Sequence, residues 1–246
     1  MKIRFLGTNG WFDTNTGNTV CILVETKNSY LILDAGNGFY KIGRYIKRDK
    51  PIYLFLSHYH LDHVIGLHIL NKFNFKQGLD IYGPPGLKAL FNKVINKPYS
   101  VALSGLSFKL RLHEITKTAI LPAGVFYAPL KHSGVCYGYR ICLENKVVSY
   151  CTDTGVCDNF FLLAKNADLL ITECSLMKGR RNLSWPHLDP QQAALVAKNS
   201  TVKRLFLVHF DAGVYLTGED RALAQRAARK IFKNTVAAKD DLSLIL

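Results

Sequence analysis

The chain has 246 residues, with 32 lysines and arginines against 18 aspartates and glutamates, which gives a formal net charge of +14. Hydrophobic residues make up 48% of it and charged residues 20%, so the composition excludes a disordered chain, a collagen and a coiled coil. The positive charge indicates an anionic partner, either a nucleic acid, a phosphorylated small molecule or a membrane surface. The alternative is a basic surface that only contacts solvent.

The first half of the chain alternates predicted strands and helices. Its strands are β-branched or aromatic runs separated by turn-forming residues, and its helices carry apolar residues at helical spacing. The run at residues 52–56 is continuously apolar, which is typical of a strand buried on both faces. We predict strands at residues 2–6, 19–25, 30–34, 52–56 and 81–82, and helices at residues 38–48 and 87–95.

The second half of the chain begins with further strands. We predict them at residues 125–128, 137–143, 146–152, 169–172 and 204–208, with Glu144 and Asn145 joining the second and third. The repeated order of strands and helices predicts one domain, residues 1–246, made of two similar layered halves.

Two helices are predicted near the end of the chain. Asp189 and Pro190 supply an N-cap and a first-turn proline for a helix at residues 191–198. A final amphipathic helix at residues 219–232 carries an apolar stripe of Leu223, Ala227 and Ile231.

The six cysteines include no Cys-x-x-Cys pair, and several lie in apolar, strand-like runs. Buried free thiols in a reducing compartment explain this pattern better than a disulfide framework or a thiolate zinc cluster. Each apolar run falls short of the roughly 18 residues that cross a membrane, and the N-terminus lacks a signal-peptide core. We therefore expect a cytoplasmic protein without a membrane partner.

Three histidines and an aspartate lie within six residues directly after the buried strand at residues 52–56. They are His58, His60, Asp62 and His63. Imidazole nitrogens and carboxylate oxygens are ligands of zinc and neighbouring transition metals. Because side chains alternate along an extended segment, His58 and His60 share one side, and the following turn directs Asp62 and His63 toward a second point. The segment predicts a site that serves two metals.

Three more polar residues end later strands. His132 follows the strand at residues 125–128, Asp153 follows the one at residues 146–152, and His209 closes the last strand. Polar residues in these positions are expected where loops build a site at one edge of a sheet. Together with the first cluster, they complete a set of seven candidate ligands.

This set resembles the metallo-β-lactamase superfamily, whose fold is a mixed α/β (α+β), four-layer αββα sandwich with a binuclear metal site between its sheets. The resemblance covers the chain from Gly7 to His209. It implies that His58, His60 and His132 bind one metal, that Asp62, His63 and His209 bind the other, and that Asp153 bridges both. It further implies a shared hydroxide, formed from a water whose pKa the two ions lower.

Departures from the family pattern indicate which branch of the superfamily this chain resembles. Many β-lactamases have a cysteine where this chain has Asp153, which argues against antibiotic hydrolysis. What remains is similar to the phosphodiesterase branch, which contains ribonuclease Z and small phosphodiesterases. In that branch a histidine paired with an acidic residue lies beside the metals. By this resemblance His187 protonates the leaving alkoxide or stabilises the phosphorane, and Glu173 orients it. Asp62 is a metal ligand, a general base, or both.

The absence of a tRNA-binding arm in the sequence predicts the class of substrate. Ribonuclease Z has a flexible arm for the tRNA elbow, inserted between the positions that match His132 and Asp153, and the short segment here leaves no room for it. We therefore expect a small or cyclic phosphodiester substrate, with RNA as the less favoured partner. Arginine forks suit phosphate oxygens, so Lys131, Arg180 and Arg181 are weak candidates for substrate contacts.

Other interpretations remain open at this stage. A thioester or lactone hydrolase uses the same chemistry, and a non-catalytic metal-binding protein could keep the fold. The cofactors are expected to be two divalent ions, zinc by default, although nitrogen and oxygen ligands also permit manganese or iron. The family often forms homodimers, which is a further expectation.

Overall fold

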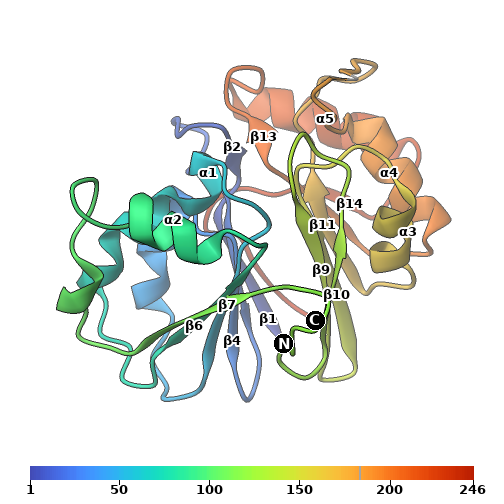
Figure 1. Cartoon of the computed structure of the whole chain (residues 1–246). Helices are drawn as coiled ribbons and strands as arrows, with labels where there is room; N and C mark the ends of the chain where they lie inside the picture. Colours follow the sequence, from blue (N-terminus) through green and yellow to red (C-terminus); the bar gives the residue numbers. More distant parts are fainter. Residues whose placement is uncertain (183) are drawn as a thin grey trace.

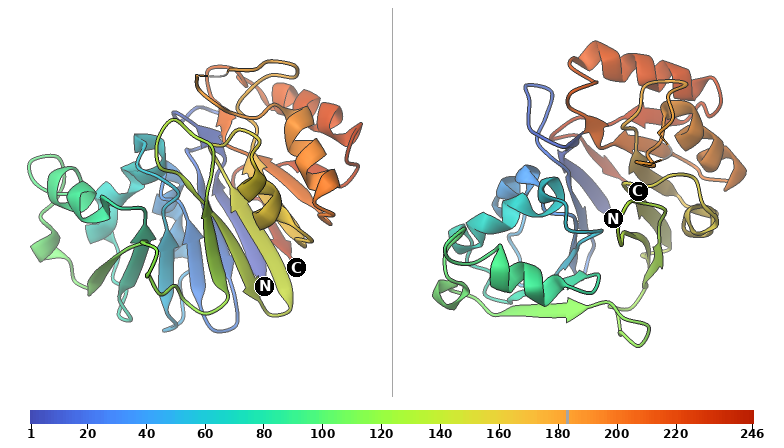
Figure 2. Two further views of the ribbon diagram at one scale, coloured as in Figure 1. Left: turned by 45° about the vertical axis from the view of Figure 1, so that its right-hand side comes forward. Right: turned by 45° about the horizontal axis from the view of Figure 1, so that its top comes forward.

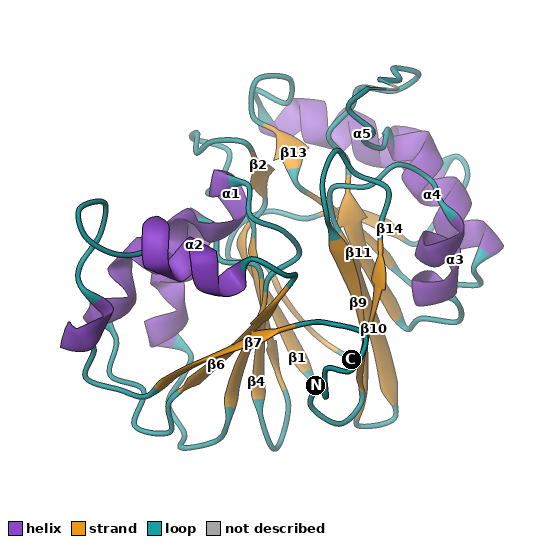
Figure 3. Cartoon of the chain, viewed as in Figure 1, coloured by secondary structure: helices purple, strands orange, loops and turns teal. Residues whose placement is uncertain are grey.

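The computed structural model describes residues 1–182 and 184–246, and it places two β-sheets face to face with helices on both outer sides (Figures 1 and 3). This is the αββα arrangement that the sequence predicts. The two chain ends lie side by side in each view (Figures 1 and 2), because Met1 O accepts a hydrogen bond of 3.0 Å from Leu246 N.

The first sheet has seven strands. β4 to β7 run parallel, whereas β15, β1 and β3 pair antiparallel with their neighbours. The strand order is β15 (Ser243–Ile245), β1 (Lys2–Gly7), β3 (Cys21–Glu25), β4 (Tyr30–Leu33), β5 (Ile52–Phe55), β6 (Leu79–Gly83) and β7 (Leu110–Glu114).

The second sheet has six strands. β10, β11, β12 and β14 run parallel, and β9 pairs antiparallel with both β8 and β10. The order is β14 (Thr235–Ala237), β12 (Leu205–Val208), β11 (Leu169–Glu173), β10 (Lys146–Cys151), β9 (Tyr137–Leu143) and β8 (Val125–Pro129). Glu144 and Asn145 join β9 to β10 with positive φ angles of 53° and 56°, as a two-residue hairpin turn requires.

A small parallel pair, β2 (Asn9–Gly10) and β13 (Phe210–Asp211), connects the two sheets at one edge. It lies beside α1 at the top of Figure 1. The helices are α1 (Leu61–Val64), α2 (Leu87–Lys93), α3 (Asp158–Ala164), α4 (Pro190–Asn199) and α5 (Gly218–Arg229), with 3-10 helices η1 (Asn37–Arg44), η2 (Ile65–Lys72) and η3 (Leu103–Gly105). None of the described helices is long and apolar enough to span a membrane.

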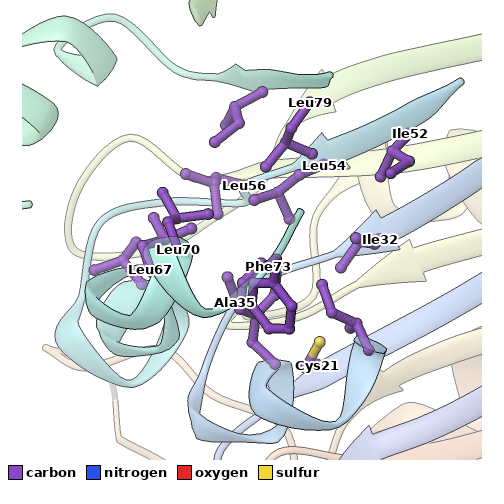
Figure 4. Close-up of a cluster of buried hydrophobic side chains, with 14 of the residues drawn as sticks. Cys21, Ile32, Ala35, Ile52, Leu54, Leu56, Leu67, Leu70, Phe73 and Leu79 are labelled. Carbon is purple, nitrogen blue, oxygen red and sulfur yellow. The ribbon is translucent and has the colours of Figure 1, made fainter. Parts of the chain in front are cut away.

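Each interface between layers has its own apolar cluster. Figure 4 shows the one between the first sheet and its helices, where Leu54 and Leu56 of the β5 segment meet Leu67 and Leu70 of η2. A second cluster packs α3, α4 and α5 on the outer face of the other sheet. The third lies between the sheets. Burial on both faces explains why β5 reads as a continuous apolar run.

The capped helix near residue 190 is confirmed. The Asp189 side chain accepts hydrogen bonds from the backbone N–H groups of Gln191 and Gln192, and Pro190 occupies the first turn. The six cysteines are free, and four of them are buried; Cys142 and Cys157 are only partly covered.

Two local predictions are wrong. The segment at residues 38–48 forms the shorter 3-10 helix η1, in which Gly38 and Gly43 disfavour a regular α-helix. In α5 the predicted stripe is misplaced, because Leu223 is 53% exposed and the buried face is instead Arg221, Ala224 and Ala228. The two alanines allow α5 to pack closely on α4 and β14.

We predict that the cluster between the sheets carries much of the stability. Phe55 is fully buried there, with ring centroids 5.3 Å from those of Tyr82 and of Tyr139. Phe55→Ala should lower the free energy of unfolding by about 3–5 kcal/mol, measured by urea denaturation, since it leaves a cavity. Phe126→Ala is the matched control, because that ring is 56% exposed and its removal should cost below about 1 kcal/mol. Equal losses in the two variants would contradict this assignment.

Candidate metal centre

The seven candidate ligands lie at one edge of the sandwich, because the strands that precede them run in the same direction. His58 and His60 follow β5, and the chain turns from extended at His60 to helical in α1, which carries Asp62 and His63. The remaining three ligands follow β8, β10 and β12: these are His132, Asp153 and His209.

The ligands form two groups. In each group, every residue offers a nitrogen or oxygen atom, and these atoms lie within 4.8 Å of one another. The first ligand group is His58, His60, His132 and Asp153, and the second ligand group is Asp62, His63 and His209.

Asp153 lies between the two groups. Its Oδ2 atom is 3.1 Å from His63 Nε2 and 3.3 Å from His209 Nε2, although its carboxylate also belongs to the first ligand group. His209 Nε2 is 3.2 Å from Asp62 Oδ2. These distances put the Asp153 carboxylate beside both groups, and its bridging of two metals stays a prediction.

The backbone is held in an uncommon conformation at three strand ends of the site. Asp34, Asp153 and His209 have φ angles of 56°, 48° and 50°, in the left-handed region that residues other than glycine rarely adopt. Such conformations cluster at functional sites, where the surrounding structure compensates for their cost. Here each one turns a polar side chain from the end of a strand toward the site.

Electrostatics favour a cation at this edge. Burial lowers the pKa of His58 well below its usual value and that of His132 to about 4, so both imidazoles are neutral. Burial opposes charge on Asp153 too, but the His209 and His63 imidazoles hold the pKa of its carboxyl well below the usual range. Burial also opposes charge on His63, yet the Asp153 carboxylate outweighs it and raises the pKa of that imidazole.

The residues fit the metals that the sequence predicts. His58 Nε2 and His132 Nδ1 are buried, and neither has a hydrogen-bond partner among the described residues. His63 Nε2 and His209 Nε2 are only 3.0 Å apart. Buried polar atoms are normally paired, and a metal ion would satisfy such neutral nitrogens alongside ionised carboxylates.

Sequence reasoning missed Asp34, which supports the second ligand group from behind. Its buried carboxylate accepts hydrogen bonds from Ser57 N (2.7 Å), Ser57 Oγ (2.8 Å) and Tyr150 OH (2.7 Å), and its Oδ2 is 2.8 Å from His63 Nδ1. A carboxylate of this kind fixes the ring orientation of a ligating histidine. The signal was present, since Asp34 also ends a strand and precedes a glycine turn.

His187 and Glu173 meet beside the ligand groups. His187 Nδ1 donates to Glu173 Oε1 at 2.8 Å, while the fully buried Glu173 also accepts from Thr154 N (2.6 Å) and Leu188 N (3.1 Å). The His187 ring centroid lies 5.7 Å from that of His132. Burial lowers the pKa of His187, but the Glu173 carboxylate outweighs burial and raises that pKa to about 9.

A cavity of about 760 Å³ opens over both ligand groups. It is lined by Gly10, Trp11, His60, Leu61, Asp62, Asp153, Ser175, Leu176, Asn182, Trp185, His187, His209 and Asp211. Lys131, Arg180 and Arg181 are exposed and are not among these described lining residues. Aromatic rings, rather than the predicted basic side chains, therefore form much of the cavity wall.

Comparison with known proteins gives consistent results. A family model for the β-lactamase superfamily domain matches residues 30–210. The ribonuclease Z of Enterococcus faecalis is 28% identical over 305 positions, which cover 98% of this chain and 96% of the relative. Since the chain has 246 residues, at least 59 of those positions have no residue here.

Two solved structures share the fold. The metallo-β-lactamase fold protein YhfI from Bacillus subtilis superposes with a TM-score of 0.82 at 24% identity, over 99% of this chain and 98% of its own. Human tRNase Z, short form, superposes with a TM-score of 0.77 at 22% identity, over 100% and 99% of the two chains.

We predict that Asp34 tightens metal binding. Asp34→Asn replaces an acceptor with a group that also donates, so it should loosen His63 and weaken metal affinity about 10- to 100-fold. Competition with a chelator, followed by metal analysis, measures this change. Tyr150→Phe is the milder control, since it removes one hydrogen bond and leaves the carboxylate. Unchanged metal affinity in Asp34→Asn would refute a supporting role.

Proposed function

This chain belongs to the β-lactamase superfamily and is a hydrolase, and we propose that it cleaves phosphodiester bonds of RNA in the manner of a ribonuclease Z. The observation that carries the proposal is the pair of ligand groups joined by Asp153, with His187 beside them. Ribonuclease Z relatives that match the chain over 98% of its length favour RNA over the small diester expected from sequence alone.

The first and second ligand groups would hold two divalent ions, with zinc as the default identity. Such ions would lower the pKa of the attacking water and neutralise charge on the phosphate. We propose Asp62 as a ligand, which is supported by its proximity to His63 and His209 in the second ligand group. Its Oδ2 also accepts a hydrogen bond of 2.8 Å from Trp11 N. This hydrogen bond makes the oxygen a weaker proton acceptor, which favours the role of ligand over that of general base.

His187 is the proposed general acid. It lines the cavity, and its Nδ1 is held by Glu173, which leaves Nε2 to donate a proton to the leaving ribose oxygen. A pKa near 9 keeps the ring protonated at neutral pH. Glu173 orients this ring and, through Thr154 N and Leu188 N, is itself fixed by the backbone.

A small or cyclic phosphodiester is the second candidate substrate. Two observations favour it. At least 59 positions of the alignment with the Enterococcus faecalis ribonuclease Z have no residue in this chain. The turn between β9 and β10 has only two residues, so this segment has no room for an arm that grips tRNA. Homodimer formation and a cytoplasmic location stay predictions, as do substrate contacts by Lys131, Arg180 and Arg181.

The substrate prediction is tested with metal-loaded protein on precursor tRNA, cyclic nucleotides, phosphoribosyl cyclic phosphate and bis(p-nitrophenyl) phosphate. We expect cleavage of precursor tRNA with a higher kcat/KM than any cyclic phosphate. Asp153→Asn should reduce all diester cleavage by at least about 100-fold, because both ligand groups lose their shared carboxylate.

Two results would count against RNA cleavage. A higher kcat/KM on a cyclic phosphate would promote the second candidate. Two bound metals with turnover of thioesters or lactones but of no diester would remove phosphodiester hydrolysis altogether.

A pH profile tests the roles of His187 and Glu173. A general acid must carry its proton, so kcat/KM should fall as the pH rises through the His187 pKa of about 9. Glu173→Gln removes the charge that raises this pKa, so the alkaline limb should move to lower pH. His187→Ala should remove that limb and lower kcat about 100- to 10,000-fold. If Glu173→Gln lowers kcat/KM equally at every pH and does not move the alkaline limb, Glu173 has a purely structural role.

A further inference from the structure

The chain has two tryptophans, and both line the cavity above the ligand groups. Trp11 is 71% exposed and Trp185 is 46% exposed. Large aromatic rings are usually covered in a folded protein, and exposed ones that gather at a cavity mark a binding surface. Their place at the site, rather than in any of the three apolar clusters, needs an explanation.

Trp11 is held in place by its backbone. Its φ angle is 72°, an uncommon conformation for a bulky side chain, and its amide donates a 2.8 Å hydrogen bond to Asp62 Oδ2. The same conformation therefore ties the main chain to the second ligand group while the indole stays at the cavity. The Phe12 ring is its aromatic neighbour, with centroids 5.9 Å apart.

The loop that carries Trp11 is anchored at its base. Asn9 Nδ2 donates to Phe12 O at 3.1 Å and to Thr14 Oγ1 at 3.0 Å. The buried guanidinium of Arg221 donates to Thr8 Oγ1 at 2.9 Å and also to the Asn9 side chain. This network explains why α5 buries an arginine, and it holds the backbone of the loop that carries Trp11 before any ligand arrives.

Trp185 stands over the first ligand group. Its ring is nearly parallel to that of His60, at 6° with centroids 5.6 Å apart, and it lies 5.9 Å from the ring of His132. One indole is therefore associated with each ligand group. A phosphate placed at Asp153, between the groups, would have an aromatic ring on either side.

We propose that Trp11 and Trp185 are stacking platforms for the nucleobases on the two sides of the scissile phosphate. This inference rests on the proposed function and makes its substrate more specific, namely a base-bearing phosphodiester instead of a sugar phosphate without a base. Stacking suits this task because every nucleobase has a flat π-face, so a tryptophan can bind any of the bases. The cavity of about 760 Å³ is within the range that encloses small ligands.

The pair of tryptophans allows a direct binding test on the metal-loaded full chain. Trp11→Leu leaves Trp185 as the sole tryptophan, and Trp185→Leu leaves Trp11, so fluorescence reports each ring separately. The probe is an adenosine dinucleotide whose phosphodiester is replaced by an uncleavable methylene phosphonate, so that it carries one base for each ring. It should quench the remaining tryptophan in both variants, and its affinity should fall about tenfold for each ring lost. Ribose 5-phosphate should bind equally to all variants and quench neither ring.

Conservative variants separate stacking from general apolar contact. Trp11→Phe and Trp185→Phe keep an aromatic face and should recover most of the affinity that the leucine variants lose. Phe126→Leu is the control, since it removes an exposed aromatic ring that is not among the described cavity-lining residues. Equal affinity for the dinucleotide and the ribose phosphate, or quenching of a single tryptophan, would overturn the proposal.

Activity on an oligoribonucleotide and on its abasic counterpart separates this inference from the proposed function. Faster cleavage of the base-bearing strand, lost in the leucine variants, supports the platforms. Equal cleavage of both strands overturns the platforms while phosphodiester hydrolysis stands. Nucleotide-specific quenching without cleavage of any diester keeps the platforms and rejects the proposed activity.

Discussion

The carboxylate of Asp34 joins the two sheets to the site. It follows β4 in the first sheet, yet it accepts a hydrogen bond from Tyr150 of β10 in the second, and it contacts Ser57 and His63 beside β5. Because all four groups are buried, none of them can exchange its partner for water without a cost. The same carboxylate therefore links the two sheets and orients a candidate ligand.

The site concentrates titratable groups in a buried place at one edge of the sandwich. Asp153 is almost fully buried between the two ligand groups. Beside it, His63 Nε2 and His209 Nε2 are only 3.0 Å apart. Buried carboxylates without a counter-charge are costly, and a divalent ion in each group would supply that charge. The positive φ angles at Asp34, Asp153 and His209 are a further cost of directing these side chains inward.

The cavity combines this charged floor with aromatic walls. His187, which is hydrogen-bonded to the buried Glu173, lines the cavity, and so do the two tryptophans. The net charge of +14 indicates an anionic partner, and the candidate metal ligands provide a more specific reason for one. A substrate with both phosphate and flat rings would use every part of this wall.

Much of the fold could be predicted because the strands are strongly patterned. β5, β11 and β12 are buried on both faces and read as continuous apolar runs, and the Asp189–Pro190 cap marks the start of α4. β7 was missed because it is half-buried at a sheet edge and mixes charged with apolar residues. In α5 the stripe was misassigned because Arg221 is buried by hydrogen bonds that hydropathy does not register.

By itself, the sequence was enough to predict the set of candidate ligands, because His58 to His63 are close together in the chain and the other candidates each end a recognisable strand. Only the tertiary structure decided what surrounds them. Tyr150 and Asp34 are 116 positions apart, and Trp11 and Asp62 are 51 apart, so neither contact leaves a trace in local spacing. Side-chain periodicity follows from the geometry of one strand or helix. The Tyr150–Asp34 contact instead depends on how two sheets pack face to face, and the Trp11–Asp62 contact on how two loops distant in the chain meet at one edge of the sandwich.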